Sequence, residues 1–290
     1  MTWVDVDGRR VHLTHLDKVL FPGGFTKAEM VDYYTRVAPA ILGQLTDRPV
    51  TRLRFPHGVE GPSFIEKNLP AGSPDWVRHH LLPASPGTPE EGTVLDLPVI
   101  DELAALVWAA NLGAIELHTP QWRVGPRGGV RRPDRLVIDL DPGAPAGLAE
   151  CAPVAHLVAD RLRQDGLTDV VPVTSGSKGL QLYAALRGTT SAVEVNAYAK
   201  DLAGALAAAH PGLVVASQQR TLRPGKVLID WSQNHPAKTT ITPYSLRGRE
   251  EPQVAAPRHW SEIGHDLVQL GPAQVLERLA RDGDLMSGGC

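Results

Sequence analysis

The stretch "RLVIDLDPG", residues 135–143, places two acidic side chains inside a run of apolar residues that has the character of a buried strand. Side chains alternate along a strand, so Asp139 and Asp141 are expected on the same face, about 7 Å apart. Paired carboxylates are hard oxygen ligands, the kind that Mg²⁺ and Mn²⁺ prefer. An acid pair of this spacing also occurs on exposed sheet faces and in turns, so the pair alone leaves both interpretations open.

A third aspartate lies at the end of another apolar strand. In "KVLIDWSQN", residues 226–234, Asp230 occupies the polar end of a strand that is expected to lie beside the first. Acids arranged in this way hold metal ions that clamp the attacking and leaving oxygens in phosphoryl transfer. Asp230 is therefore the candidate for the third acid of such a site.

Small and cationic residues near these strands suit phosphate. The turn "TSGSKG", residues 174–179, joins two short strands, and its small residues let backbone N–H groups and the Ser175 hydroxyl approach phosphate oxygens beside Lys178. Arg223 and Arg247 lie near the third aspartate in sequence and are candidates for the same triphosphate. The turn taken alone is also consistent with a plain hairpin. The combination indicates metal-dependent chemistry on a nucleotide but does not separate synthesis from hydrolysis.

The composition is that of a globular protein of 290 residues, with 42% apolar and 21% charged residues. No uncharged apolar run approaches the ~18 residues that a membrane span requires, and the N-terminus lacks a signal pattern, so we expect a cytoplasmic protein without membrane contact. The net charge of −3 does not point to nucleic-acid binding. Five arginines do gather in residues 123–135, where a solvated loop is the plain interpretation. Cys151 and Cys290 have neither a disulfide framework nor metal-ligand spacing.

The remaining pattern mixes helices and strands and favours an α/β fold of the α+β type, with a mostly antiparallel sheet. Thr26 followed by Glu29 is a capping box, which predicts a helix over 26–45. Other helices are expected from about 101 to 113, over 150–164, from 191 to the His-Pro-Gly stop at 210–212, and within 273–283. Strands are expected within 48–56, before 118–120 and on both sides of the turn at 174–179, with a loop over 82–93.

Five segments in combination resemble the polymerase domain of bacterial DNA ligase D, a member of the archaeo-eukaryotic primase superfamily. They are "RLVIDLDPG", "VTSGSKGLQLY", "KVLIDWSQN", "KTTITPYSLRGR" and "ELHTPQW". The resemblance runs from "LTHLDKVLFP" to "RLARDGDL" and so covers nearly the whole chain. It implies one primase-polymerase domain over 1–290, with an N-terminal α/β module at about 1–120 and an RRM-like, mostly antiparallel palm sheet with flanking helices at about 121–290.

The same resemblance implies an activity, which is the template-dependent addition of nucleotides, often ribonucleotides, to a DNA primer during gap filling or double-strand-break end joining. The cofactor would be Mn²⁺, or Mg²⁺. The implied partners are a DNA end or gapped duplex with a 5′-phosphate, an NTP or dNTP, a Ku-like end binder and a separate DNA ligase, all in the nucleoid. No ligase or nuclease sequence is recognisable in the chain, so we expect a stand-alone polymerase or an excised domain.

The resemblance also assigns roles to individual residues. The catalytic acids and metal ligands would be Asp139, Asp141 and Asp230. The nucleotide would be bound by Phe64, His118, Ser175, Lys178, Gln181, Arg223, Gln233 and Arg247. Lys18 and Lys27 would recognise the 5′-phosphate on the downstream side of a gap. The plain alternatives are an ordinary core phenylalanine at position 64 and two solvated lysines at positions 18 and 27.

Three positions depart from the family pattern. Gln181 stands where the family usually has histidine, so an uncharged amide replaces a group that can carry a proton near neutral pH. Ile65 replaces a second aromatic, and Leu53 replaces a lysine, which reduces stacking surface and positive charge. Two other functions therefore stay open: a metal-dependent nucleotide phosphohydrolase, and a DNA-end-bridging module whose catalysis has decayed at Gln181.

Overall fold

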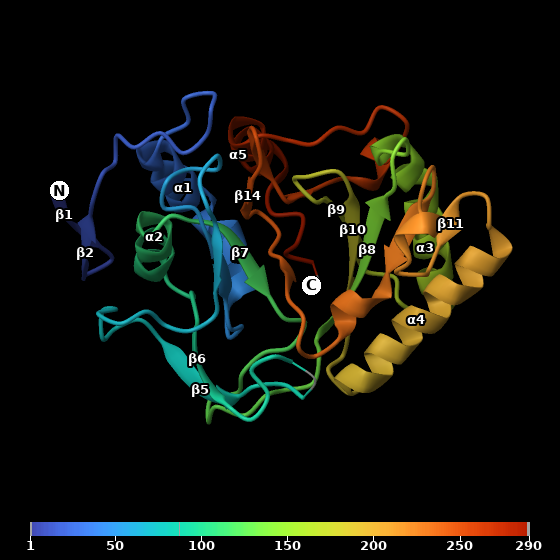
Figure 1. Ribbon diagram of the computed structural model, residues 1–290, viewed down its shortest axis with the longest axis horizontal. Coiled ribbons are helices and arrows are strands. Elements are labelled where there is room, and N and C mark those ends of the chain that lie inside the picture. Colours follow the sequence, from blue (N-terminus) through green and yellow to red (C-terminus); the bar gives the residue numbers. More distant parts are fainter. Residues whose placement is uncertain (1, 87, 289–290) are drawn as a thin grey trace.

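Two sheets, each packed against its own helices, make up most of the protein (Figure 1). The computed structural model describes residues 2–86 and 88–288. The larger sheet has six strands, in the order β11 (Val214–Val215), β12 (Val227–Asp230), β8 (Arg135–Pro142), β10 (Leu180–Ala185), β9 (Val170–Thr174) and β16 (Ala256–Pro257). All of its pairings are antiparallel except β11 with β12. The predicted α/β class with a mostly antiparallel sheet is confirmed.

The side chains of strand β8 point alternately to two faces of the sheet, and the two sets have different roles. Leu136, Ile138 and Leu140 pack into a core beneath α3 (Leu148–Gln164) and α4 (Ala192–Ala209). The alternate residues point the other way, where Asp139 and Asp141 face a pocket. The apolar alternation thus fixes the strand in the sheet, and the same period of two puts both acids on the opposite face.

The second sheet belongs mainly to the N-terminal half. Its order is β13 (Thr240–Ile241), β7 (Ala114–Thr119), β3 (Thr51–Arg54) and β4 (Phe64–Glu66). Helices α1 (Lys27–Leu45) and α2 (Leu103–Asn111) pack together in its core. Strand β13 comes from the C-terminal half, and α5 (Pro272–Asp282) packs on α1, so the C-terminal half contributes to both the N-terminal sheet and its core.

Three two-stranded hairpins complete the fold. They are β1 (Thr2–Val6) with β2 (Arg9–Leu13), β5 (His79–Pro83) with β6 (Val94–Pro98), and β14 (Leu246–Gly248) with β15 (Pro252–Val254). Short 3₁₀ turns follow at Arg220–Leu222, Trp231–Asn234 and Trp260–Glu262. Within residues 2–86 and 88–288, none of the helices combines the length and the apolar character that crossing a membrane would require.

The helices lie where the sequence predicts them. Thr26 caps α1, with its side chain accepting from the Glu29 backbone N–H while the Glu29 carboxylate accepts from the Thr26 N–H. The predicted loop at 82–93 connects strands β5 and β6, except that Leu82 and Pro83 belong to β5. Cys151 is buried beneath β8, and Cys290 lies outside the described residues.

The arginine-rich stretch at 123–135 is only partly the solvated loop that its composition suggests. Arg135 is fully buried, donating to the Gln121 and Thr119 side chains, and Arg123 pairs with Asp134 at 2.6 Å. The solvated-loop interpretation is therefore wrong for these two arginines. The partners of Arg135 come from the end of the preceding strand and just beyond it, whereas the partner of Arg123 lies within the same stretch.

Candidate active site

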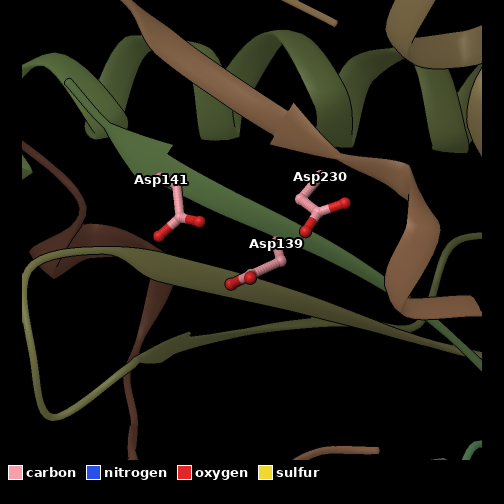
Figure 2. Close-up of side chains that lie close together, drawn as sticks. All are labelled: Asp139, Asp141 and Asp230. Carbon is pink, nitrogen blue, oxygen red and sulfur yellow. The ribbon is translucent and has the colours of Figure 1, made fainter. Parts of the chain in front are cut away.

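The three predicted acids converge on one face of the larger sheet (Figure 2). Strand β8 lies between β12 and β10, and the register places Asp139 directly opposite Asp230 on one side and Gln181 on the other. Ligand oxygens of Asp139, Asp141 and Asp230 all lie within 4.8 Å of one another. Sequence spacing predicted the first pair, and the antiparallel register supplies the third acid.

The acid cluster carries strong mutual repulsion. Burial, followed by the charges of Asp141 and Asp230, raises the pKa of Asp139 well above the usual range of a carboxyl group, against a hydrogen bond from Gln181 and the charge of Arg247. Three carboxylates in this arrangement offer only hard oxygen ligands, which fits a divalent cation such as Mg²⁺ or Mn²⁺. A bound cation would relieve the repulsion.

The carboxylate of Asp230 is held by its neighbours. Its Oδ1 accepts from the Gln218 amide and from both the backbone N–H and the hydroxyl of Ser232. Its Oδ2 accepts from Gln233 Nε2 at 3.0 Å. Gln233 thus lies at the acid cluster, and the network fixes the orientation of the third acid.

The turn at 174–179 lines the pocket. The Ser175 hydroxyl and the glycines of the turn determine its shape. Ser175 Oγ accepts from the backbone N–H groups of Ser177 and Gly179, which closes the turn on itself. A Cβ at Gly179 would lie 2.3 Å from the Leu140 carbonyl oxygen, so this position requires glycine. Lys178 is exposed at the tip. The turn thereby presents small groups and one free ammonium beside the acids.

These elements enclose a pocket with a volume of about 220 Å³. Eight of the predicted residues line it, namely His118, Asp139, Asp141, Ser175, Lys178, Gln181, Gln233 and Arg247. Asp230 lies beside them through its contacts with Asp139 and Gln233. The remaining lining residues are Ser177, Thr239, Thr240, Ile241 and Arg249. The lining thus combines the acids with three cationic groups, Lys178, Arg247 and Arg249.

Gln181 is locked in place. Its amide contacts Asp139, and its Oε1 accepts from the Tyr183 hydroxyl at 3.1 Å. The Tyr183 ring is fully buried, and its hydroxyl also donates to the Ile241 carbonyl. The glutamine therefore keeps a hydrogen bond to the acid cluster.

Two residues predicted to contact the nucleotide lie elsewhere. Arg223 donates to the carbonyl and the side-chain oxygen of Gln218, whose amide in turn reaches Asp230, so Arg223 touches the acid cluster only through an intermediary. Phe64 lies on the edge strand β4, with 43% of its surface exposed and the Arg54 guanidinium 5.0 Å above its ring. The alternative of an ordinary core phenylalanine is wrong.

Lys18 and Lys27 form a separate cationic corner. Lys18 donates to the Pro56 carbonyl at 2.7 Å, and Lys27 donates to the carbonyl and hydroxyl of Thr14. Burial and the charges of Lys18 and Arg54 lower the pKa of Lys27 to about 8. Lys27 is only 6% exposed, so the interpretation as a solvated lysine is wrong at that position.

Sequence reasoning missed Glu116, which lies behind the pocket and contacts both His118 and Arg247. Its position two residues before His118 on one strand was a usable signal, since both side chains then share a face. Tyr183 was also missed, although it follows Gln181 by the same spacing. Both residues are buried in the strands that carry the site.

Comparisons with known proteins agree with this geometry. Residues 26–286 match the family description "LigD, primase-polymerase domain". The multifunctional non-homologous end joining protein LigD of Mycobacterium bovis is 46% identical over 285 residues, covering 96% of this chain and 37% of that protein. The bifunctional LigD of Bacillus subtilis is 31% identical, covering 94% of this chain and 43% of its own length. The chain thus spans well under half the length of these relatives.

A solved structure extends the match to the fold. The polymerase domain from Mycobacterium tuberculosis ligase D, in complex with DNA, superposes with a TM-score of 0.90 at 44% identity, covering 97% of this chain and 99% of that domain. Sequence and structure therefore agree over nearly the full length. The chain belongs to the LigD primase-polymerase domain family, a family of polymerase and primase nucleotidyltransferases.

Proposed function

We propose that this chain adds nucleotides, with ribonucleotides preferred, to the 3′ end of a DNA primer on a template during gap filling and end joining. The observation that carries the proposal is the meeting of three carboxylates with a Ser/Gly/Lys turn in one pocket. A self-repelling acid cluster needs cations, and a nucleoside triphosphate with its metal ions supplies them while placing its phosphates toward the turn.

Asp139, Asp141 and Asp230 are the proposed metal ligands. Mn²⁺ or Mg²⁺ bound there would activate the primer 3′-hydroxyl and stabilise charge on the leaving pyrophosphate. Gln181 and Gln233 hold the carboxylates in position through their hydrogen bonds to Asp139 and Asp230. The acids are thus set before any substrate arrives, which lowers the cost of assembling the site.

The cationic residues of the pocket form the proposed triphosphate site. Lys178 is exposed. Arg247 is only 15% exposed and pairs with Glu116 at 3.1 Å. The Ser175 hydroxyl adds a neutral donor, because its oxygen accepts from two N–H groups of the turn while its own proton can point to a phosphate. His118 lines the same pocket and is the proposed contact for the rest of the nucleotide.

The cationic corner is the proposed site for a DNA 5′-phosphate. Lys18 and Lys27 supply two ammonium groups whose mutual repulsion a phosphate would neutralise. The exposed ring of Phe64, beside Arg54, is a proposed stacking surface for a base near that phosphate. The DNA complex of the tuberculosis domain and the end-joining names of the relatives support DNA ends as the substrate. A Ku-like end binder and a separate ligase are proposed partners on the same ground.

Primer extension tests the proposal directly. A labelled primer on a gapped duplex with a downstream 5′-phosphate is incubated with Mn²⁺ and either rNTPs or dNTPs. We expect extension by the wild-type protein, faster with rNTPs, and none by Asp139→Asn. Asp134→Asn is the matched control, because Asp134 is an acid outside the pocket that pairs with Arg48 and Arg123.

The same reaction separates the alternatives. A nucleotide phosphohydrolase would release phosphate or pyrophosphate without primer, whereas a polymerase releases pyrophosphate only as the primer grows. An end-bridging module would bind the duplex and extend nothing, with or without Asp139. Either of these results would overturn the proposal.

A further inference from the structure

Glu116 lies at the junction of two strands that reach the pocket from different sheets. It is on β7, next to His118 on the same face, and it faces the hairpin strand β14, which carries Arg247. Only 3% of its surface is exposed, and it is absent from the lining of the pocket among the described residues. Glu116 therefore acts on any ligand through its neighbours.

Three donors converge on this one carboxylate. His118 Nε2 lies 2.8 Å from Glu116 Oε2, and Arg247 Nη1 lies 3.1 Å from the same oxygen. The Gly248 backbone N–H donates to Oε1 at 2.9 Å. Although burial alone would raise it, the hydrogen bond from His118 and the charge of Arg247 hold the pKa of Glu116 below its usual value. The carboxylate is thus ionised and accepts at both oxygens.

An acceptor-only partner decides which nitrogen of a neutral imidazole carries the proton. Because ionised Glu116 can only accept, the proton of neutral His118 must lie on Nε2, which leaves the Nδ1 lone pair as an acceptor. His118 then accepts a hydrogen bond from a ligand through Nδ1. The same carboxylate holds the Arg247 guanidinium by charge, so one buried group sets both an acceptor and a cation on the pocket wall.

We propose that Glu116 is a positioning residue that fixes the Nε2–H tautomer of His118 and the placement of Arg247, and thereby sets the hydrogen-bonding character of the nucleotide pocket. The inference rests on the proposed function for its ligand, a nucleoside triphosphate. Its consequence is that His118 recognises an O–H group of the nucleotide, while Arg247 recognises a phosphate.

Glu116→Gln tests this with almost no change in shape. The Gly248 N–H holds the amide oxygen on the Oε1 side, so the amide NH₂ replaces the oxygen that faces His118 and Arg247. An NH₂ there donates to His118 Nε2, which moves the imidazole proton to Nδ1, and it repels Arg247. We expect ¹⁵N NMR of the histidines to show His118 switching from the Nε2–H to the Nδ1–H tautomer in the substrate-free protein.

The kinetic expectation is a change in substrate binding. The KM for the nucleotide should rise about tenfold or more in Glu116→Gln, the equivalent of one hydrogen bond to a charged group, with a smaller change in kcat. Combining Glu116→Gln with His118→Ala and Arg247→Ala should add little to the double variant, because Glu116 would then have nothing to position. Asp134→Asn is the control, an ion-pair acid outside the pocket whose loss should leave the KM unchanged.

The outcomes of the two failures differ. An unchanged His118 tautomer, or a KM no higher than that of Asp134→Asn, in a protein that extends primers would overturn the role of Glu116 and leave the polymerase standing. A switched His118 tautomer in a protein that does not extend primers would support the positioning role of Glu116 and contradict the proposed function. Should Glu116→Gln fail to fold, Glu116→Asp carries the test, since the shorter carboxylate should yield mixed tautomers and a raised KM, and unchanged values would refute the role.

Discussion

The acid cluster and the cationic corner carry opposite charges, but each brings groups of like charge close together. Asp139, Asp141 and Asp230 crowd negative charge into the larger sheet, while Lys18 and Lys27 crowd positive charge beside the N-terminal sheet. In both regions burial, followed by a neighbouring like charge, shifts a pKa toward the neutral form. Stability alone would not select either arrangement, so each is best explained by a ligand of opposite charge.

A structural ion-pair cluster in the same chain shows the contrast. Asp134 is held between Arg48 and Arg123, at 2.6 Å from each, and these arginines keep the pKa of Asp134 below its usual value against its burial. Charges that only stabilise a fold are matched in this way. Within the described residues, the acid cluster and the cationic corner lack this matching, and that difference supports the proposal that they bind ligands.

The largest expected effect comes from breaking the acid cluster. Asp139→Asn should lower primer extension by roughly 10³-fold or more, because it removes a metal ligand that acts in the transition state. It should also raise the melting temperature of the metal-free protein, because it removes a carboxylate whose ionised form the fold disfavours.

Asp134→Asn should instead lower the melting temperature and leave primer extension unchanged. The two variants are compared by differential scanning calorimetry in the presence of a chelator. A lower melting temperature for Asp139→Asn than for the wild type would contradict the claim of a self-repelling cluster.

Breaking the cationic corner should cost less and should depend on the DNA. Replacing Lys18 and Lys27 by alanine should weaken binding to gapped duplex with a 5′-phosphate by about 10- to 100-fold, the range of one or two charge-assisted contacts. Binding to the same duplex with a 5′-hydroxyl should hardly change. Fluorescence anisotropy with the two duplexes measures the difference, and an equal loss on both would indicate general electrostatic attraction instead.

The pH dependence of DNA binding gives a further test of the cationic corner, because it depends on the charge of Lys27. Its lowered pKa, about 8, means that the ammonium loses its proton as the pH rises through that value, whereas a bound phosphate would keep it charged. Binding must then take up a proton, so the preference for a 5′-phosphate should fall as the pH rises above about 8. Lys27→Arg stays charged in this range and should flatten the profile. A flat profile in the wild type would remove Lys27 from the phosphate site.

The smallest expected effect concerns Gln181. Gln181→Leu should lower extension by roughly tenfold, because Asp139 loses one hydrogen bond while the acids stay in place. Gln181→Glu should cost more, since it adds a fourth negative charge to the cluster. Steady-state extension rates of the two variants decide between them. Equal activity in Gln181→Leu and the wild type would show that the amide has no part in catalysis.

The positions of the strand acids could be predicted from the sequence because the alternation of side chains along a strand depends only on neighbouring residues. Asp139 and Asp141 lie on one face for that reason alone, and Asp230 joins them through an antiparallel register that the apolar strand pattern permits. The capping box of α1 and the glycine turn at 174–179 were predictable for the same local reason.

Long-range pairing is what the sequence did not reveal. Glu116 matters because β7 meets a hairpin strand about 130 residues later in the chain, at Gly248. The burial of Arg135 depends on Gln121 and Thr119, and the pairing of β13 with β7 brings the C-terminal half into the N-terminal sheet. Such contacts depend on tertiary packing, which propensity and spacing do not encode.

Binding of Mn²⁺ to the acid cluster is the most direct test of the account, because it requires neither DNA nor nucleotide. Free Mn²⁺ is followed by electron paramagnetic resonance as metal is titrated into the wild type, Asp139→Asn and Asp134→Asn. We predict that the wild type and Asp134→Asn bind Mn²⁺ equally and that Asp139→Asn loses most of that binding. Equal binding by all three proteins would contradict a metal site at Asp139, Asp141 and Asp230.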